Sequence, residues 1–420
     1  MIKHSPSDFQ VEELLTLSFR DLAGSVGPFA LYRLHKETLA TPEAVGSIAR
    51  QLRTPAGAWA YAGLKDKHAS TSQHLTLKQE GVSATPEQAA GPGWRIERLA
   101  FVPRSITAAD IEGNRFRIIV RNLKAERSAD MGEAAKLLTV AGPAMGGTAA
   151  ERASTVPDAG ADRTPVVRIV NYFGDQRFGS ARHGQGFIGK HLCQGDFEGA
   201  LRLAIATESR KDRMEQKVFK RTLREYWGRW REVLPRLRRC PERRAVERLV
   251  HSSKDFRAAF CALPYLVQQL SVYAYQSWLW NSIARDLIAR HCASLGQVLA
   301  ADDPFGEMLF PAASAVPPEL AALQLPLLAR KTVLAPPWQE AAQEVLRAEG
   351  IELGSLHIPG VRRPFFGEEP RALFFNAADF KLASAEPDET ARGQGRLKRL
   401  VSFVLPRGSY ATVVLRALGQ

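Results

Sequence analysis

The sequence contains few cysteines and no close grouping of them. Its 420 residues include only four, Cys193, Cys240, Cys261 and Cys292, with no C-x-x-C pair and no neighbouring Cys/His cluster. A zinc site or a disulfide framework is therefore not indicated. The sequence also has no P-loop motif and no H-E-x-x-H motif. Neither a P-loop nucleotidase nor a zinc hydrolase is predicted.

Long apolar runs are absent as well. The longest apolar stretch lies within residues 263–288 and is interrupted by proline, glutamine, asparagine and aspartate, so no window of about 20 residues suits a bilayer. Residues 1–13 are mixed polar and resemble neither a signal peptide nor a transit peptide. We therefore expect a reduced, cytoplasmic protein without a membrane partner.

Positive charge is in excess and is concentrated in one region. The chain has 57 Lys and Arg against 44 Asp and Glu, a net charge of +13. Residues 208–248 hold 15 of the basic and 7 of the acidic residues, an excess of +8. Such a field favours a polyanion such as nucleic acid. With 45% hydrophobic residues the chain can form a core, and its length suggests two or three domains.

The first 125 residues mix strand and helix signals. Thr41 can cap a helix over 41–52, and Pro42 suits its first position. In the strand predicted over 115–121, alternate residues form an apolar face and a cationic face, the latter with Arg115, Arg117 and Arg121. Alternation of polar and apolar residues predicts further strands at 8–13, 29–34 and 59–62, and another from Gln73 onward. A polar loop at 63–68 separates the strand at 59–62 from the one that begins at Gln73.

Later segments differ in character. An apolar run at 166–170 indicates a buried strand, helical patterns dominate from 184 to about 351, and 304–337 is predicted to form irregular connections between short helices. Strand signals return from Ala372 and end at 401–405 and 410–415. The simplest architecture is an α/β domain made of both ends of the chain, with a mostly helical module inserted.

Two motifs carry possible chemistry. Asp66 lies among Lys65, Lys67 and His68 in a loop, and nearby cations favour an ionised carboxylate, which suits a nucleophile or base. A solvated charged turn explains the same residues. Residues 184–189 match G-x-G-x-x-G, but the preceding residues are polar rather than a buried strand. A dinucleotide site is therefore not predicted.

The basic region also contains aromatic residues. Trp227 and Trp230 lie three apart with Tyr226 beside them, and stacking on RNA bases is one interpretation. Helical spacing favours core packing for the two tryptophans. The arginines are better candidates for contacts with RNA phosphates.

Four separated segments, together with the C-terminal region, resemble the TruD family of tRNA pseudouridine synthases. The two middle segments, 61–69 and 113–116, are highly specific. All occur in the family's order and approximate spacing, and they are Lys3–Glu12, Tyr61–Ala69, Gly113–Phe116, Asn171–Gly179 and Leu405–Thr412.

The resemblance implies an α+β fold: a mixed, largely antiparallel catalytic domain from 1–180 and 362–420, with a helical TRUD domain inserted at 181–361. It implies that Asp66 is the catalytic aspartate. It also implies that Phe9, Asn114 and Tyr410 contact the target nucleotide, with Lys3 and Phe116 close by. The family more often has Phe at the position of Tyr410, which adds a hydroxyl here.

The implied reaction isomerises a uridine, typically uridine 13 of tRNA, to pseudouridine. It needs no cofactor, metal or nucleotide donor. An aspartate, ionised at pH 7 from an ordinary pKa of about 3.9, can attack at C1′ of the ribose or at the uracil ring. We expect a monomer. The rival interpretations are a non-catalytic tRNA-binding protein or chaperone on the same fold, and another RNA-modifying enzyme such as a methyltransferase.

Overall fold

A computed structural model describes residues 4–82, 85–143, 163–181, 184–209, 212–391 and 395–420. The chain forms two compact units. The first joins Met1–Ile169 to Phe375–Gln420, and the second is Val170–Phe374. The borders thus lie before Val170 and after Phe374, rather than at 180/181 and 361/362. The family motif at 171–179 therefore belongs to the second unit.

The first unit is built on one large sheet. Its strands follow the order β5-β6-β2-β4-β1-β7-β16-β14-β9-β8, with β3 paired to β4 and β15 to β16. Among the pairings whose register is described, only β1 with β4 is parallel. The strands are β1 (Phe9–Leu15), β2 (Phe29–Lys36), β3 (Trp59–Tyr61), β4 (Ser70–Lys78), β5 (Gln88–Gly91), β6 (Trp94–Val102), β7 (Ile111–Leu123), β8 (Thr139–Pro143), β9 (Arg163–Val170), β14 (Phe374–Leu382), β15 (Glu386–Pro387) and β16 (Leu397–Pro406).

Strand β7 joins the two ends of the chain. Ile118 pairs with Phe9 of β1 on one side and with Val401 of β16 on the other. Further along, Gly113 lies so close to β16 that a Cβ atom there would overlap the carbonyl oxygen of Leu405. The close approach therefore requires glycine at this position.

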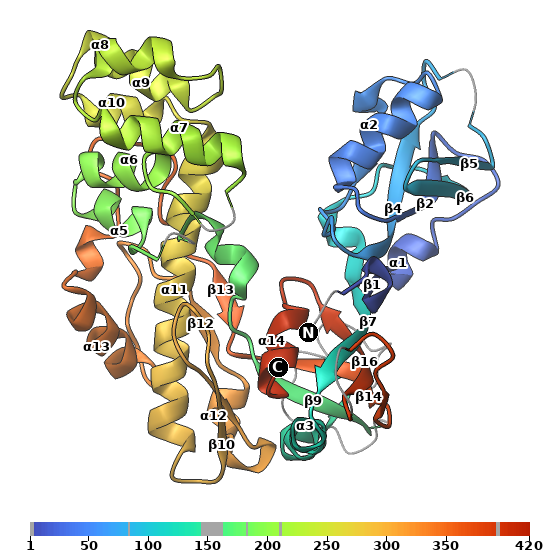
Figure 1. Cartoon of the computed structure of the whole chain (residues 1–420). Coiled ribbons are helices and arrows are strands. Elements are labelled where there is room, and N and C mark those ends of the chain that lie inside the picture. Colours follow the sequence, from blue (N-terminus) through green and yellow to red (C-terminus); the bar gives the residue numbers. More distant parts are fainter. Residues whose placement is uncertain (1–3, 83–84, 144–162, 182–183, 210–211, 392–394) are drawn as a thin grey trace. The chain divides into compact units, whose positions relative to one another are not determined.

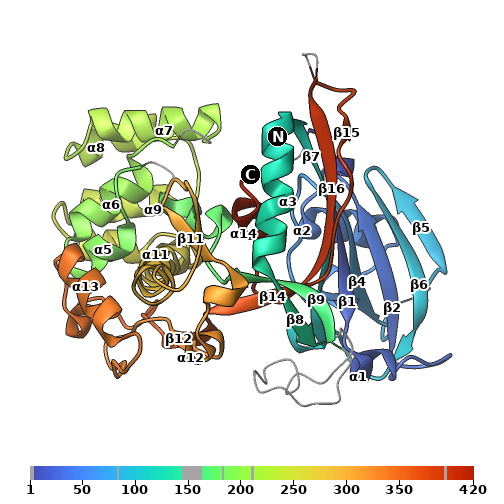
Figure 2. The ribbon, with the colours of Figure 1, turned by 90° about the horizontal axis from the view of Figure 1, so that it is seen from below.

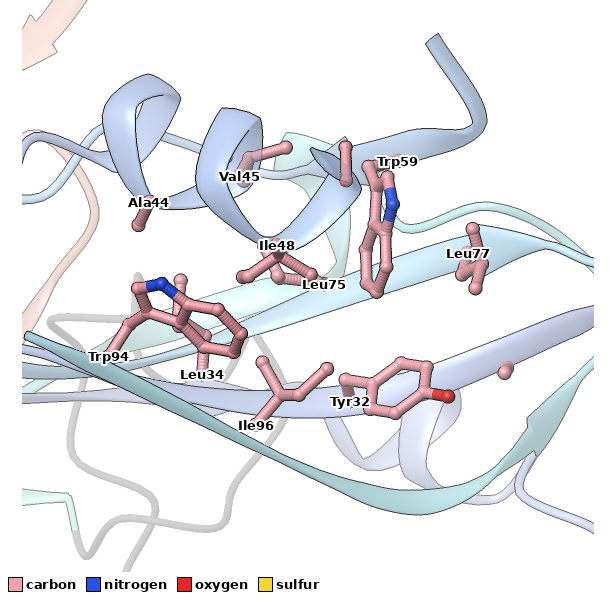
Figure 3. Packing of buried hydrophobic residues seen from close by; sticks show 12 residues of the cluster. Tyr32, Leu34, Ala44, Val45, Ile48, Trp59, Leu75, Leu77, Trp94 and Ile96 are labelled. Carbon is pink, nitrogen blue, oxygen red and sulfur yellow. The ribbon is translucent and has the colours of Figure 1, made fainter. Parts of the chain in front are cut away.

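Helix α2 (Thr41–Gln51) covers part of this sheet and closes one hydrophobic core over it. Figure 3 shows Ile48 of the helix pointing toward Leu75 and the other apolar side chains of the sheet. The polar edges of the buried rings are satisfied, since Trp94 Nε1 donates to Ser47 Oγ at 3.0 Å and the Tyr32 hydroxyl to Pro86 O at 2.9 Å. The remaining helices of this unit are α1 (Leu17–Arg20), α3 (Ala125–Leu138) and α14 (Ala411–Ala417), with short 3-10 turns η1 (Pro6–Asp8), η2 (Ala56–Ala58) and η3 (Ala108–Asp110).

The predicted cationic face of β7 is wrong at Arg121. Arg115 and Arg117 are exposed, but Arg121 is only 8% exposed. Its Nε donates to both carboxylate oxygens of Asp8 at 3.0 Å, and its Nη1 donates to Asp388 Oδ1 at 3.0 Å. The two aspartates come from opposite ends of the sequence, so the guanidinium ties these ends together and is not available to an anionic ligand.

A C-terminal helix replaces the strand predicted at 410–415. Tyr410 precedes α14, whose buried residues Ala411, Val414 and Leu415 follow helical spacing. The β-branched residues of this segment gave a strand signal, but the turn at Gly408, with φ of 79°, ends the sheet before them.

In the second unit, helix α11 (Tyr265–Cys292) is the central element. Figures 1 and 2 show it running through this unit, and α5, α13, η4 and β11 pack against it. The other elements are η4 (Asp175–Ala181), α5 (Ile188–Cys193), α6 (Phe197–Ile205), α7 (Met214–Glu225), α8 (Trp230–Val233), η5 (Leu234–Arg236), α9 (Arg243–His251), α10 (Phe256–Cys261), β10 (Val298–Ala301), β11 (Met308–Pro311), η6 (Ala313–Ala315), α12 (Pro318–Ala321), β12 (Gln324–Pro326), α13 (Gln339–Glu349), η7 (Leu353–Ser355) and β13 (Pro370–Ala372).

Buried polar side chains show that α11 is a core helix. Gln276 Nε2 donates to the carbonyls of Leu328 and Gly367 at 2.8 and 2.9 Å, and Trp280 Nε1 donates to Leu325 O at 3.0 Å. No helix in the described part of the chain is long and apolar enough to cross a membrane.

The glycine motif at 184–189 has a packing role at its last position. Gly189 packs so close to Tyr275 that a Cβ there would lie 2.6 Å from the tyrosine Cβ. The last glycine of G-x-G-x-x-G thus serves helix packing.

Two further predictions have clear outcomes in this unit. Trp227 and Trp230 pack edge to face, with ring centroids 4.9 Å apart. Trp230 is buried, so its core role is confirmed, whereas Trp227 is half-buried. Residues 304–337 contain strands as well as short helices: β11 pairs with β10, and β12 pairs with β13. Prolines lie in and around these short strands. Because proline is normally a sign against a strand, the sequence pattern did not predict them.

The acid stability of the first unit should depend on Asp388. Burial alone would raise the pKa of Asp388, but the Asn122 N–H, Thr390 and Arg121 lower it to about 2. This stabilisation is therefore present above the ordinary pKa near 3.8 and is lost as the pH falls toward 2. Asp388→Asn should lower stability at pH 6 by about 1–2 kcal/mol, and thermal melts should show the difference from wild type shrinking between pH 4 and pH 2. Asp130→Asn, at an exposed position on α3, is the matched control, and a pH-independent difference at Asp388 would contradict the prediction.

Candidate active site

Asp66 lies in the loop between β3 and β4, in the first unit. Its Oδ1 accepts the backbone N–H of His68 at 2.9 Å. This bond to an N–H two residues on is typical of an aspartate that shapes its own turn. Asp66 as a whole is half-buried, so the residue is held in its loop while part of it stays accessible.

Two buried polar side chains tie this loop to its neighbours. The Thr41 hydroxyl accepts the Lys65 N–H at 3.1 Å and donates to Gln73 Oε1 at 2.8 Å. Gln73 Nε2 in turn donates to Gly63 O at 3.3 Å. Thr41 therefore holds the loop and is not the helix cap that the sequence predicts. Ala40 occupies the cap position, where its N–H donates to Glu43 Oε2 at 2.9 Å.

A buried lysine supports the loop from the end of β2. Lys36 is 1% exposed, and its Nζ donates to three carbonyl oxygens: those of Leu39 at 2.8 Å, Asp66 at 3.0 Å and Lys65 at 3.4 Å. Burial lowers the pKa of Lys36 to about 8, although the charge of Asp66 opposes that shift. An ammonium has three donors, and here each finds a backbone acceptor.

A second lysine joins the loop to β1 and β7. Lys65 Nζ lies 2.7 Å from Glu13 Oε2 and donates to Asn114 Oδ1 at 2.7 Å. Glu13 is 2% exposed and pairs with Asn114 across the strands. Burial alone would raise the pKa of Glu13, but hydrogen bonds from His74 and the charge of Lys65 lower it below its usual value.

Aromatic rings line the same face of the sheet as Asn114. Phe116 lies two residues along β7, with its ring centroid 6.1 Å from that of Phe9 and 5.5 Å from that of Phe403. Phe9 is 5% exposed and Phe116 is half-buried. Tyr410 is also half-buried and follows β16, whose Pro406 pairs with Gly113 beside Asn114.

The structure thus connects several of the predicted site residues. Asp66 is joined to Asn114 through Lys65, and Phe9 packs with Phe116. Tyr410 follows β16, the strand that pairs with the other side of β7, and Lys3 lies outside the described residues. Among the described residues, no group of His, Cys, Asp and Glu is placed to hold a metal ion.

Sequence reasoning missed the buried polar residues around the loop. Glu13, Lys36, Thr41 and Gln73 each carry part of the network. Lys36 and Glu13 lie in segments with a strand pattern, and a charged residue in such a pattern is normally predicted to be exposed to solvent. Only the folded structure shows that Glu13 meets Lys65 and that Lys36 meets the carbonyls of the loop.

Comparison with known proteins identifies the family. Residues 1–418 match the tRNA pseudouridine synthase D (TruD) family. The chain belongs to this family. It is 30% identical to a Methanopyrus kandleri protein named probable tRNA pseudouridine synthase D, over 97% of this chain and 89% of the relative. It is 28% identical to the tRNA pseudouridine synthase D of Aquifex aeolicus, over 99% of this chain and 97% of the relative.

A solved structure shares the fold. The crystal structure titled as that of the "putative tRNA pseudouridine synthase D (TruD)" from Methanosarcina mazei has a TM-score of 0.70 and 22% identity, and the match covers 99% of this chain and 92% of that one. The predicted α+β class is therefore confirmed. TruD proteins are isomerases, and the chain is an enzyme of this class, a tRNA pseudouridine synthase.

Removing the Thr41 hydroxyl should loosen the Asp66 loop. Thr41→Val keeps the shape of the side chain but leaves the Lys65 N–H and the Gln73 carbonyl without their partner, which costs about 1–3 kcal/mol. We expect a lower melting temperature and faster hydrogen exchange in peptides covering residues 63–68. Thr41→Ser, which keeps the hydroxyl, is the control. Unchanged exchange in Thr41→Val would show that the hydroxyl does not hold the loop.

Proposed function

We propose that this enzyme converts uridine 13 of tRNA to pseudouridine with Asp66 as the nucleophile. The observation that carries the proposal is the hydrogen-bonded connection from the Asp66 loop through Lys65 to Asn114. It unites, in one unit, residues from two separate motifs shared with the family. The names of the relatives from Methanopyrus kandleri and Aquifex aeolicus support tRNA as the substrate.

The proposed reaction breaks the bond between N1 of uracil and C1′ of the ribose and forms a bond between C5 and C1′. The proton on C5 leaves and N1 gains one, so the overall change is an isomerisation without oxidation or reduction. The Asp66 carboxylate supplies an electron pair to C1′ or to the uracil ring and is released when the new bond forms. Its hydrogen bond from the His68 N–H holds the attacking group in place.

The target uridine must leave its stack, which costs a few kcal/mol. Aromatic side chains offset such a cost when they stack with the extruded base. Phe116 and Tyr410, both half-buried, are the rings we propose for this contact. Phe9 is buried and supports Phe116 from one side.

Asp66→Asn and Asp66→Ala should abolish turnover while leaving tRNA affinity within about tenfold, or roughly 1.4 kcal/mol. Tritium release from tRNA transcripts labelled at C5 of uridine measures turnover without any added cofactor. Mapping of pseudouridine in the product then tests position 13. Asp130→Asn is the control, because Asp130 is exposed on α3. Substantial turnover by both Asp66 variants would remove Asp66 from its role, and wild-type binding without any turnover would favour the non-catalytic interpretation.

The basic region 208–248 is the second element of the proposal. Several of its arginines are paired with acids, as in the contacts of Arg221 and Arg224 with Glu208 at 3.1 Å. Arg231, Arg239 and Arg244 are exposed, and none has an ion pair with a described residue. We propose that such arginines contact tRNA phosphates.

Reversing the charge of Arg231, Arg239 and Arg244 to Glu should weaken tRNA binding and flatten its salt dependence. Each lost phosphate contact reduces the slope of log K against log salt by about 0.7–0.9. Filter binding at 50–200 mM salt gives this slope. Lysine at the same three positions keeps the charge and should keep the slope. If the slope of log K against log salt is unchanged in the Glu variant, these three arginines are only solvated and do not contact tRNA.

A further inference from the structure

The orientation of the Asn114 amide follows from its contact with Lys65. Lys65 Nζ lies 2.7 Å from the atom assigned as Oδ1. An ammonium has donors and no acceptor, so the amide must turn its oxygen toward Lys65. The Nδ2 group points elsewhere, and no described residue accepts a hydrogen bond from it.

Lys65 is itself fixed by a buried carboxylate. Glu13 Oε2 lies 2.7 Å from Lys65 Nζ, and Glu13 Oε1 accepts the His74 N–H at 2.9 Å. Glu13 stands directly opposite Asn114 in the pairing of β1 with β7. The Glu13–Lys65–Asn114 chain therefore comes from two paired strands and the Asp66 loop, and it leaves the amide only one favourable orientation.

We propose that Lys65 is a positioning residue that acts through Asn114, and that Asn114 recognises the target base by donating from Nδ2 to a carbonyl oxygen of uracil. The inference rests on the proposed function, because it takes Asn114 to contact the target uridine. To that proposed contact it adds the direction of the hydrogen bond, from Asn114 to the base, and the two residues that set this direction, Lys65 and Glu13.

A donor at this position selects the base and suits the reaction. Uracil presents an oxygen at position 4, where cytosine presents an amino group that donates. A donor that faces position 4 therefore forms a hydrogen bond with the O4 atom of uracil. With cytosine it faces another donor and forms none. Moving the sugar bond from N1 to C5 turns the uracil ring about the line through N3 and C6, which exchanges O2 and O4. The same amide donor thus meets an oxygen both before and after the ring turns.

Asn114→Asp tests the direction of this hydrogen bond. Aspartate has nearly the same shape and still presents an oxygen to Lys65, but it replaces the Nδ2 donor by an acceptor. We expect kcat/KM on tRNA transcripts to fall at least tenfold, as far as in Asn114→Ala. Turnover within twofold of wild type in Asn114→Asp would overturn the inference, since the amide would then not act as a donor.

A double-variant cycle tests whether Lys65 acts through Asn114. Lys65→Met should lower kcat/KM about tenfold in the wild-type background and less than twofold in the Asn114→Ala background. An equal loss in both backgrounds would show that Lys65 acts independently of Asn114. Circular dichroism and thermal melts verify folding, and the Asn114→Asp result decides the inference if Lys65→Met does not fold.

Wild type and Asp66→Asn, measured in the same assay, separate this inference from the proposed function. Turnover by wild type but not by Asp66→Asn, with Asn114→Asp still active, removes the donor role alone. Failure of wild type on every tRNA, and on total cellular RNA, removes the proposed function and with it the donor role.

Discussion

Two lysine ammonium groups, of Lys36 at the end of β2 and of Lys65 in the Asp66 loop itself, anchor this loop, and its position depends on how their charges are satisfied. A buried ammonium without partners costs several kcal/mol, so its acceptors must be in place when the protein folds. Lys36 takes three backbone carbonyls, two of them in the loop, and Lys65 takes Glu13 and Asn114. The position of the Asp66 backbone is therefore fixed by neighbouring charges as well as by the turn itself.

This arrangement requires strands from distant parts of the sequence. Glu13 reaches Lys65 because β1 lies between β4, which follows the Asp66 loop, and β7, which carries Asn114. β16 then pairs with the other side of β7. The first unit thus cannot complete its sheet until the chain has returned from the second unit, and Arg121 secures that return by binding Asp8 and Asp388 together.

Much of this architecture follows from sequence patterns, and the exceptions share a cause. Alternation predicted β1, β2 and β7, and helical spacing predicted α2, because one face of each element is more deeply buried than the other over most of the predicted residues. Patterns failed where tertiary contacts override local preference: Arg121 is buried by two distant aspartates, and Thr41 turns from a cap into a support for the loop. The Asp66 motif was recognisable as a string of residues, but the buried Glu13 and Lys36 beside it have no comparable local signal.

The positive charge of the chain consequently has two separate roles. Part of it is internal: Lys36, Lys65 and Arg121 are largely shielded from water, and each contacts acceptors within the first unit. Other basic residues are exposed in the second unit, where arginines such as Arg231 and Arg244 form no ion pair with a described residue. Net charge alone predicts a polyanionic ligand, yet it cannot distinguish the two groups. Unpaired, exposed arginines are better placed to attract RNA over a distance than Lys65 and Arg121, whose charges are already balanced by Glu13, Asp8 and Asp388.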